Sequence, residues 1–196
     1  MNKLHFIKDE MLIHIPVCTH AQPESILVVG GCNDIRHEIE KHACLKESTF
    51  IDADGAIDAL EKLSGNRYDI AVVADDRFSD NRDFWIALTK LLDEKGVVSA
   101  LSPDIYRDIE SSKTNMKLLG SIYKIVMPYR YEEEREGGMV LSHMVLASRF
   151  YHPTADLNLQ RADLTSGFRY YNSDIAISAF ATPTFINREY LGIIKR

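Results

Sequence analysis

The sequence has few cysteines, no long apolar run and no excess of basic residues. The three cysteines, Cys18, Cys32 and Cys44, are an odd number, and no two of them have the C-x-x-C spacing. A disulfide framework or a structural zinc site is therefore not expected, and a reducing cytoplasm fits this pattern best. No run approaches the roughly 18 apolar residues of a membrane-spanning helix. The first residues lead into mixed polar sequence rather than a signal peptide.

The balance of charges is acidic, with 23 Lys and Arg against 29 Asp and Glu, a net charge of −6. Without a basic stripe, non-specific nucleic-acid binding is not expected. The 196 residues predict about one domain at roughly 150 residues per domain, and the 45% hydrophobic fraction is that of a globular protein. We expect an N-terminal helix and linker over residues 1–24 and a Rossmann-like domain over 25–196, forming one globular unit.

Apolar spacing predicts an alternation of helices and strands. We expect helices over 6–20, 34–41, 54–63, 83–94 and 103–119, and strands over 25–29, 49–52, 69–74 and 97–101. Two β-rich runs, 122–128 and 139–148, flank a charged segment over 130–138 and predict an antiparallel hairpin with a charged tip; a short helix follows near 174–181. This order predicts an α/β fold: a doubly wound, mostly parallel sheet of the class I methyltransferase type with a C-terminal antiparallel hairpin.

In such sheets, ligands bind beyond the carboxyl ends of the strands. Gly30 and Gly31 follow the first strand and open a helix at Asp34, which indicates either a nucleoside or sulfonium pocket or a tight turn without a ligand. Asp52 lies about 22 residues further on, where a carboxylate can accept both ribose hydroxyls. Asp54 has the same possible role, or it caps the next helix.

Three acids, Asp75, Asp76 and Asp80, follow the third strand. They can bind a cation or deprotonate an amine, or they form a solvated loop. No histidine or second acidic cluster is placed to complete a metal shell, so no metal is expected. The seven histidines show no ligand spacing and are expected at the surface or as caps. The adjacent aromatics Tyr170 and Tyr171 can seal the edge of the sheet.

Two segments resemble the polyamine aminopropyltransferases, the spermidine synthases. Residues 168–183, FRYYNSDIAISAFATP, are similar to the family's C-terminal pattern K/R-Y-Y-N-x-D-[VI]-H-R-A-A-F-x-L-P. Residues 10–31, EMLIHIPVCTHAQPESILVVGG, resemble E-M-x-x-H-x-P-L-x-x-H-P-x-P-x-x-V-L-V-I-G-G. The similarity continues in order through 68–73 and 84–98, so it covers nearly the whole chain.

The resemblance implies transfer of an aminopropyl group from decarboxylated S-adenosylmethionine to putrescine, with this donor as co-substrate and no further cofactor. It implies that Asp75, aided by Asp76, is the base that binds the amine. It also implies that Gly30, Gly31, Asp34, Asp52 and Asp54 line the nucleoside pocket, that Tyr170 walls the substrate slot, and that the protein is a cytoplasmic homodimer.

Four departures from the family pattern leave alternatives open. The glycine-rich motif G-G-G-D-G-G is reduced to residues 30–34; in the family's D-[ST]-[ST]-D loop, Ala74 and Arg77 occupy the two aspartate positions. The segment from Asp52 to Tyr68 is one strand–helix unit shorter. The family's N-terminal β-domain is expected to be absent. Where the family has Y-H/Q directly before the position of Glu10, this chain has Lys8 and Asp9. The alternatives are a catalytically impaired nucleoside-binding or interaction homologue, and a small-molecule methyltransferase.

Overall fold

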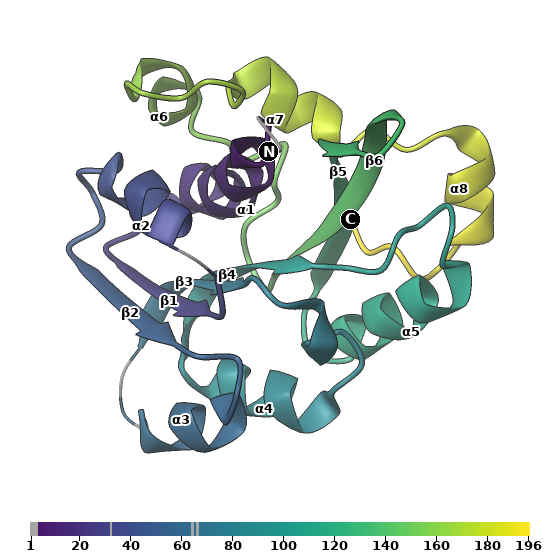
Figure 1. Ribbon diagram of the computed structural model, residues 1–196. Coiled ribbons are helices and arrows are strands. Elements are labelled where there is room, and N and C mark those ends of the chain that lie inside the picture. Colours follow the sequence, from purple (N-terminus) through teal and green to yellow (C-terminus); the bar gives the residue numbers. More distant parts are fainter. Residues whose placement is uncertain (1–3, 32, 64, 66) are drawn as a thin grey trace.

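The computed structural model describes residues 4–31, 33–63, 65 and 67–196, and it is built around a six-stranded sheet in the order β2-β1-β3-β4-β6-β5 (Figure 1). Four strands are parallel: β1 (Ser25–Val29), β2 (Glu47–Ile51), β3 (Tyr68–Val73) and β4 (Leu92–Leu101). The hairpin of β5 (Ile125–Arg135) and β6 (Gly138–Ser148) adds two antiparallel strands beside β4. The predicted α/β class and the antiparallel hairpin are therefore confirmed.

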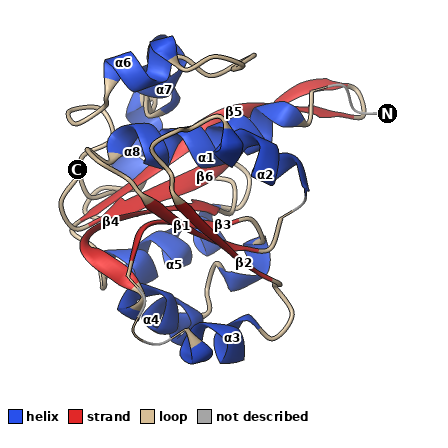
Figure 2. Ribbon diagram, turned by 90° about the vertical axis from the view of Figure 1, so that its left-hand side faces the viewer, coloured by secondary structure: helices blue, strands red, loops and turns tan. Residues whose placement is uncertain are grey.

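Helices cover both faces of this sheet (Figure 2). The first face carries α1 (Phe6–Thr19), α2 (Asn33–Glu40), α6 (Leu159–Leu164) and α7 (Ser173–Ala179). The second carries α3 (Ala56–Lys62), α4 (Arg82–Lys90), α5 (Ile109–Gly120) and α8 (Thr184–Glu189). In β1, Ile26 and Val28 pack on the first face and Leu27 on the second, all 0% exposed. Burial on both faces explains why this strand is an uninterrupted apolar run.

Two boundaries around β4 differ from those predicted. The fourth helix ends at Lys90, and β4 already begins at Leu92. The helix predicted from residue 103 begins only at Ile109. Asp104 explains the delay, because its Oδ1 accepts hydrogen bonds from the backbone N–H groups of Tyr106 (2.8 Å) and Arg107 (2.9 Å) and so forms a separate turn.

The charged segment 130–138 is not the predicted loop at the hairpin tip. The strands pair as far as Arg135 opposite Gly138, and the turn is confined to residues 136 and 137. Tyr129 and Tyr131, which are one period apart along β5, are both buried against the core of the first face. This alternation continues the strand beyond the point where charge alone predicts a loop.

Buried polar groups tie α1 to its neighbours. His14 Nδ1 lies 2.8 Å from His42 Nε2, and His14 Nε2 lies 3.0 Å from Glu38 Oε2. Lys41 also donates to Glu38, and the Phe168 ring lies 4.0 Å from the His14 ring. Burial lowers the pKa of His14, and burial, together with His14, lowers the pKa of His42 to about 3. Both imidazoles are therefore neutral and serve as hydrogen-bonding parts of the core.

A second buried group, Glu10 of α1, holds the C-terminal segment. This residue is 0% exposed, and its carboxylate accepts hydrogen bonds from the backbone N–H groups of Arg169 (3.0 Å), Tyr170 (2.9 Å) and Tyr171 (2.9 Å). The two segments that carry the family resemblance thus meet at this carboxylate. Among the described residues, no helix has both the length and the apolar character needed to cross a membrane.

Candidate active site at the carboxyl edge of the sheet

Three parallel strands end side by side at the predicted site. The Gly30 N–H donates to the carbonyl of Ile51 (2.9 Å), and the Ala74 N–H donates to the carbonyl of Val29 (2.9 Å). Gly30 has φ +73°, and a Cβ there would lie 3.4 Å from the Asp75 Cβ and 3.7 Å from the Ala53 Cβ. The loops after β1, β2 and β3 therefore converge on Gly30.

Gly31 is required by the turn itself. Its φ is +95°, and a Cβ would lie only 2.6 Å from the Cδ1 of Ile35. Packing and backbone conformation thus account for both glycines without a ligand. Asp34 lies in the first turn of α2; its side chain is 52% exposed, and its Oδ2 lies 3.1 Å from His5 Nε2.

The two acids after β2 both face solvent. Asp52 is exposed, and within the described residues it has no hydrogen bond or ion pair. Asp54 has a side chain that is 91% exposed, and its Oδ1 lies 2.5 Å from Arg77 Nη1. The alternative in which Asp54 caps the next helix is wrong, because Gly55 is the N-cap of α3 and no side-chain cap is present.

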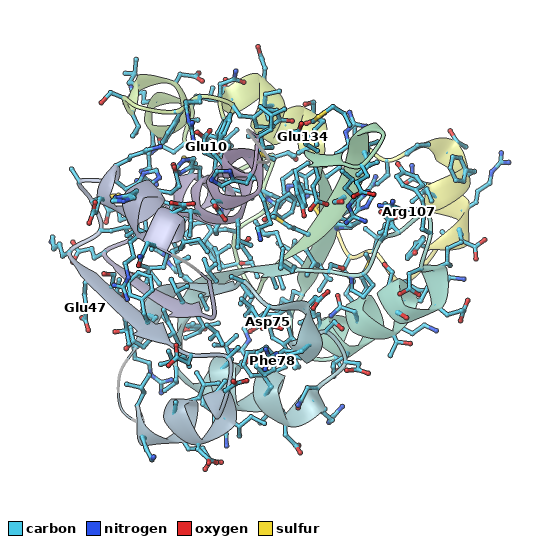
Figure 3. The ribbon with its side chains drawn as sticks, in the orientation of Figure 1. Glu10, Glu47, Asp75, Phe78, Arg107 and Glu134 are labelled. Carbon is cyan, nitrogen blue, oxygen red and sulfur yellow. The ribbon has the colours of Figure 1, made fainter. Side chains whose placement is uncertain are left out.

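Asp75 lies at the end of β3 with a side chain that is 21% exposed (Figure 3). Its Oδ1 accepts hydrogen bonds from both the backbone N–H and the Nε of Arg77, each at 3.0 Å. Arg77 thus bridges Asp75 and Asp54, and these hydrogen bonds raise its pKa. The bridge places a positive charge between Asp75, which is predicted to bind the amine, and Asp54, which is predicted to line the nucleoside pocket.

Asp76 and Asp80, which follow Asp75 along the chain, line a cavity of about 520 Å³. Asp108 and Glu110 also line it, so half of the eight lining residues are acidic. In the described part of the chain, neither Asp76, Asp80 nor Asp108 forms a salt bridge. The cavity therefore carries uncompensated negative charge next to Asp75.

Tyr170 is half-buried and packs against the core of the first face, where Glu10 fixes its backbone. None of the contacts described for it reaches Asp75 or Gly30. The structure therefore brings together Gly30, Asp54 and Asp75, and places Tyr170 with α1 instead.

Sequence reasoning missed two polar residues of this region, Asp104 and His143. The expectation that histidines lie at the surface or cap helices is wrong for His14, His42 and His143, which are all buried, whereas the buried His20 is the C-cap of α1. His143 lies on β6, where residues 142–148 are all buried. Its place in an apolar strand was the signal that could have identified it. No group of three or more His, Cys, Asp or Glu side chains among the described residues is arranged to hold a metal ion.

Comparisons with known proteins find similar sequences. The family model for the spermine/spermidine synthase domain matches residues 5–78. The polyamine aminopropyltransferase of Thermotoga petrophila is 24% identical, covering 98% of this chain and 76% of the relative; that of Bacillus subtilis is 26% identical, covering 94% and 78%.

Solved structures show the same fold. A spermidine synthase in complex with the transition-state analogue AdoDATO superposes with a TM-score of 0.83 at 22% identity, covering 97% of this chain and 76% of that one. The spermidine synthase of Thermotoga maritima gives 0.81 at 23% identity. Together with the two segments that meet at Glu10, these matches show that the chain is similar to polyamine aminopropyltransferases and has the fold of spermidine synthase.

Proposed function

We propose that this protein transfers an aminopropyl group from decarboxylated S-adenosylmethionine to putrescine. The observation that carries the proposal is the convergence of Gly30, Ala53 and Asp75 at the ends of three neighbouring strands, next to a cavity lined by carboxylates. A sulfonium donor and a diamine are both cationic, so an acidic edge can align them. The sulfonium makes its neighbouring carbon electrophilic, and the amine nitrogen displaces the thioether sulfur of methylthioadenosine.

In this proposal Asp75, aided by Asp76, binds the acceptor, and Asp52 and Asp34 face the nucleoside. The bridge from Arg77 does not prevent acceptor binding. The Arg77 side chain is 52% exposed, and exposed ion pairs contribute only about 0–1 kcal/mol. A diamine with two positive charges can therefore replace the guanidinium beside Asp75.

The test is an assay of purified protein with both sulfonium donors and a panel of diamines. Formation of spermidine and methylthioadenosine from the decarboxylated donor is expected, and Asp75→Asn should abolish it. Asp83→Asn is the matched control, because Asp83 is exposed on α4 and does not line the cavity. Correctly folded wild-type protein without turnover contradicts the proposal, and transfer from intact S-adenosylmethionine identifies a methyltransferase instead.

One observation favours a second candidate, a nucleoside-binding relative without turnover. Arg77 stands where the family pattern has its second aspartate, and it forms ion pairs with both Asp75 and Asp54. Calorimetry that detects methylthioadenosine binding in a protein without transferase activity would select this candidate.

A further inference from the structure

A cavity of about 420 Å³ lies between the loop after β4 and the hairpin, beside the acidic cavity. The two cavities share Asp76, Pro103 and Asp108 in their walls, so together they form one groove. Figure 3 shows Asp75 and Arg107 on the loops that follow β3 and β4. The groove therefore begins one residue from Asp75 and continues toward β6.

His143 of β6 forms part of this second cavity. Its side chain is 2% exposed, and its Nδ1 lies 3.3 Å from Asp104 Oδ2. Neither ring nitrogen makes a well-formed hydrogen bond within the described residues. Buried polar groups in native proteins nearly always have a hydrogen-bond partner. Since Nδ1 lies beside Asp104, Nε2 is the nitrogen left without a partner, and its place in a residue that lines a cavity indicates that this partner belongs to a ligand.

The charges around the cavity specify the chemistry of that ligand. The Arg107 Nη2 lies 2.7 Å from Asp104, and the Arg135 Nη2 lies 2.8 Å from Glu133, so both arginines are neutralised. Asp76 and Asp108 have no such partner among the described residues. The remaining charge is negative and favours a cation with N–H donors, which is the chemistry of a primary amine.

We propose that His143, oriented by Asp104, accepts the proton that the acceptor amine loses in this cavity. This inference rests on the proposed transferase function and deepens it. With its own proton on Nδ1 beside Asp104, the imidazole leaves Nε2 as the acceptor. The ammonium gives one proton to Nε2, and the freed lone pair forms the C–N bond to the aminopropyl carbon. The C–S bond breaks with its electron pair on sulfur, and the imidazolium later releases its proton to solvent.

An imidazole suits this step better than the carboxylate of Asp75. The ordinary pKa of histidine, about 6.5, is closer to that of an alkylamine than the value of about 3.9 for aspartate. The Oδ1 of Asp75 already accepts two hydrogen bonds from Arg77. Burial lowers the pKa of His143 below its ordinary value, and the Asp104 carboxylate opposes that shift without reversing it. The hydrogen bonds from Arg107 and from backbone N–H groups, acting against burial, lower the pKa of Asp104 to about 2, so its carboxylate is charged and can stabilise the imidazolium.

The kinetic test compares His143→Gln with wild type. We expect kcat to fall about 100-fold, because a positioned general base contributes roughly that much or more. The acid limb of the pH profile, which reports protonation of His143, should disappear. Asp104→Asn should lower kcat and move the same limb. His37→Gln is the matched control, since His37 is 70% exposed on α2. A His143→Gln protein within twofold of wild type overturns the assignment.

A second measurement needs neither turnover nor a variant. The Hε1 resonance of His143 is followed by NMR against pH, with and without putrescine and methylthioadenosine. A bound dication beside the ring should lower the pKa of His143 by about 1 or more; an unchanged titration overturns the assignment. If the pKa of His143 shifts in this way but the protein shows no turnover, the proposed function is refuted, whereas binding of the amine beside His143 is supported. Turnover in a protein whose His143 does not respond would refute only the assignment.

Discussion

The polar groups beneath α1 and those at the carboxyl edge of the sheet are satisfied in different ways. Beneath α1, Glu10 and His14 are 0% exposed and bound to fixed partners. At the edge, Asp54 and Arg77 are 91% and 52% exposed, and their ion pair can be exchanged for a pair with a ligand. The comparison teaches that the first region holds the fold together, whereas the second contributes little stability and is free to bind cations.

The largest effect is expected from Glu10→Ala, which breaks the α1 region. Three backbone N–H groups lose their acceptor, one of them buried and two partly buried, and each unsatisfied buried donor costs about 1–3 kcal/mol. We expect the free energy of unfolding to fall by about 3 kcal/mol or more, measured by urea denaturation. Glu40→Ala is the control: Glu40 is 72% exposed, so its loss should stay within about 0.5 kcal/mol. A loss below 1 kcal/mol for Glu10→Ala would mean that this carboxylate does not hold the C-terminal segment.

The next effect is a loss of stability in acid. His42 binds a proton near pH 6.5 when unfolded but only near pH 3 when folded. Its contribution is therefore present above pH 6.5 and is lost as the pH falls toward 3, by about 2 kcal/mol between pH 7.5 and 5. His14 acts in the same direction. Asp9, whose pKa burial raises to about 6, acts in the opposite direction.

This pH effect is isolated by comparing wild type with His42→Gln, in which Asp9 is unchanged. Thermal unfolding between pH 7.5 and 5 should show wild type losing about 2 kcal/mol more than the variant. His37→Gln should keep the wild-type slope, because His37 is exposed. Equal slopes for wild type and His42→Gln would show that the buried histidines do not set the acid stability.

Much of the fold was predictable, because it is encoded locally. The apolar runs of β1 and β3 and the glycines after β1 gave the strands and the first turn nearly to the residue. The hairpin arms were longer than predicted, because burial of Tyr129 and Tyr131 depends on α1 and on the other helices of the first face, which the charged segment does not reveal.

The site was only partly predictable. Asp75 and the convergence of the loops follow from the parallel strand order. The ion pair between Arg77 and Asp54 joins residues that are 23 positions apart in the sequence. The close approach of His143 on β6 to Asp104 in the loop after β4 joins residues that are 39 positions apart. Such pairs are determined by the packing of the loops rather than by local pattern, so sequence periodicity does not predict them.

A smaller effect is expected at the nucleoside side of the edge, from Asp52→Asn. In the proposed function the carboxylate accepts hydrogen bonds from both ribose hydroxyls, and an amide keeps only one such acceptor. Methylthioadenosine should bind about tenfold more weakly by calorimetry, a loss of about 1.4 kcal/mol. Unfolding should be unchanged, because Asp52 is exposed. Asp58→Asn on α3 is the control; equal affinity in the two variants would remove Asp52 from the pocket.

The smallest effect is expected from Arg77→Gln, and its sign decides the comparison. If the guanidinium only occupies Asp75 and Asp54 until a diamine replaces it, its removal should lower the KM for putrescine up to about fivefold, the value of an exposed ion pair near 1 kcal/mol. Stability should change by less than about 1 kcal/mol. Arg82→Gln makes the same change of charge at an exposed position of α4 and should alter neither quantity. A higher KM would make Arg77 a substrate-binding residue. A loss of stability above about 2 kcal/mol would show that the ion pairs of Arg77 hold the fold together, as the buried groups beneath α1 do.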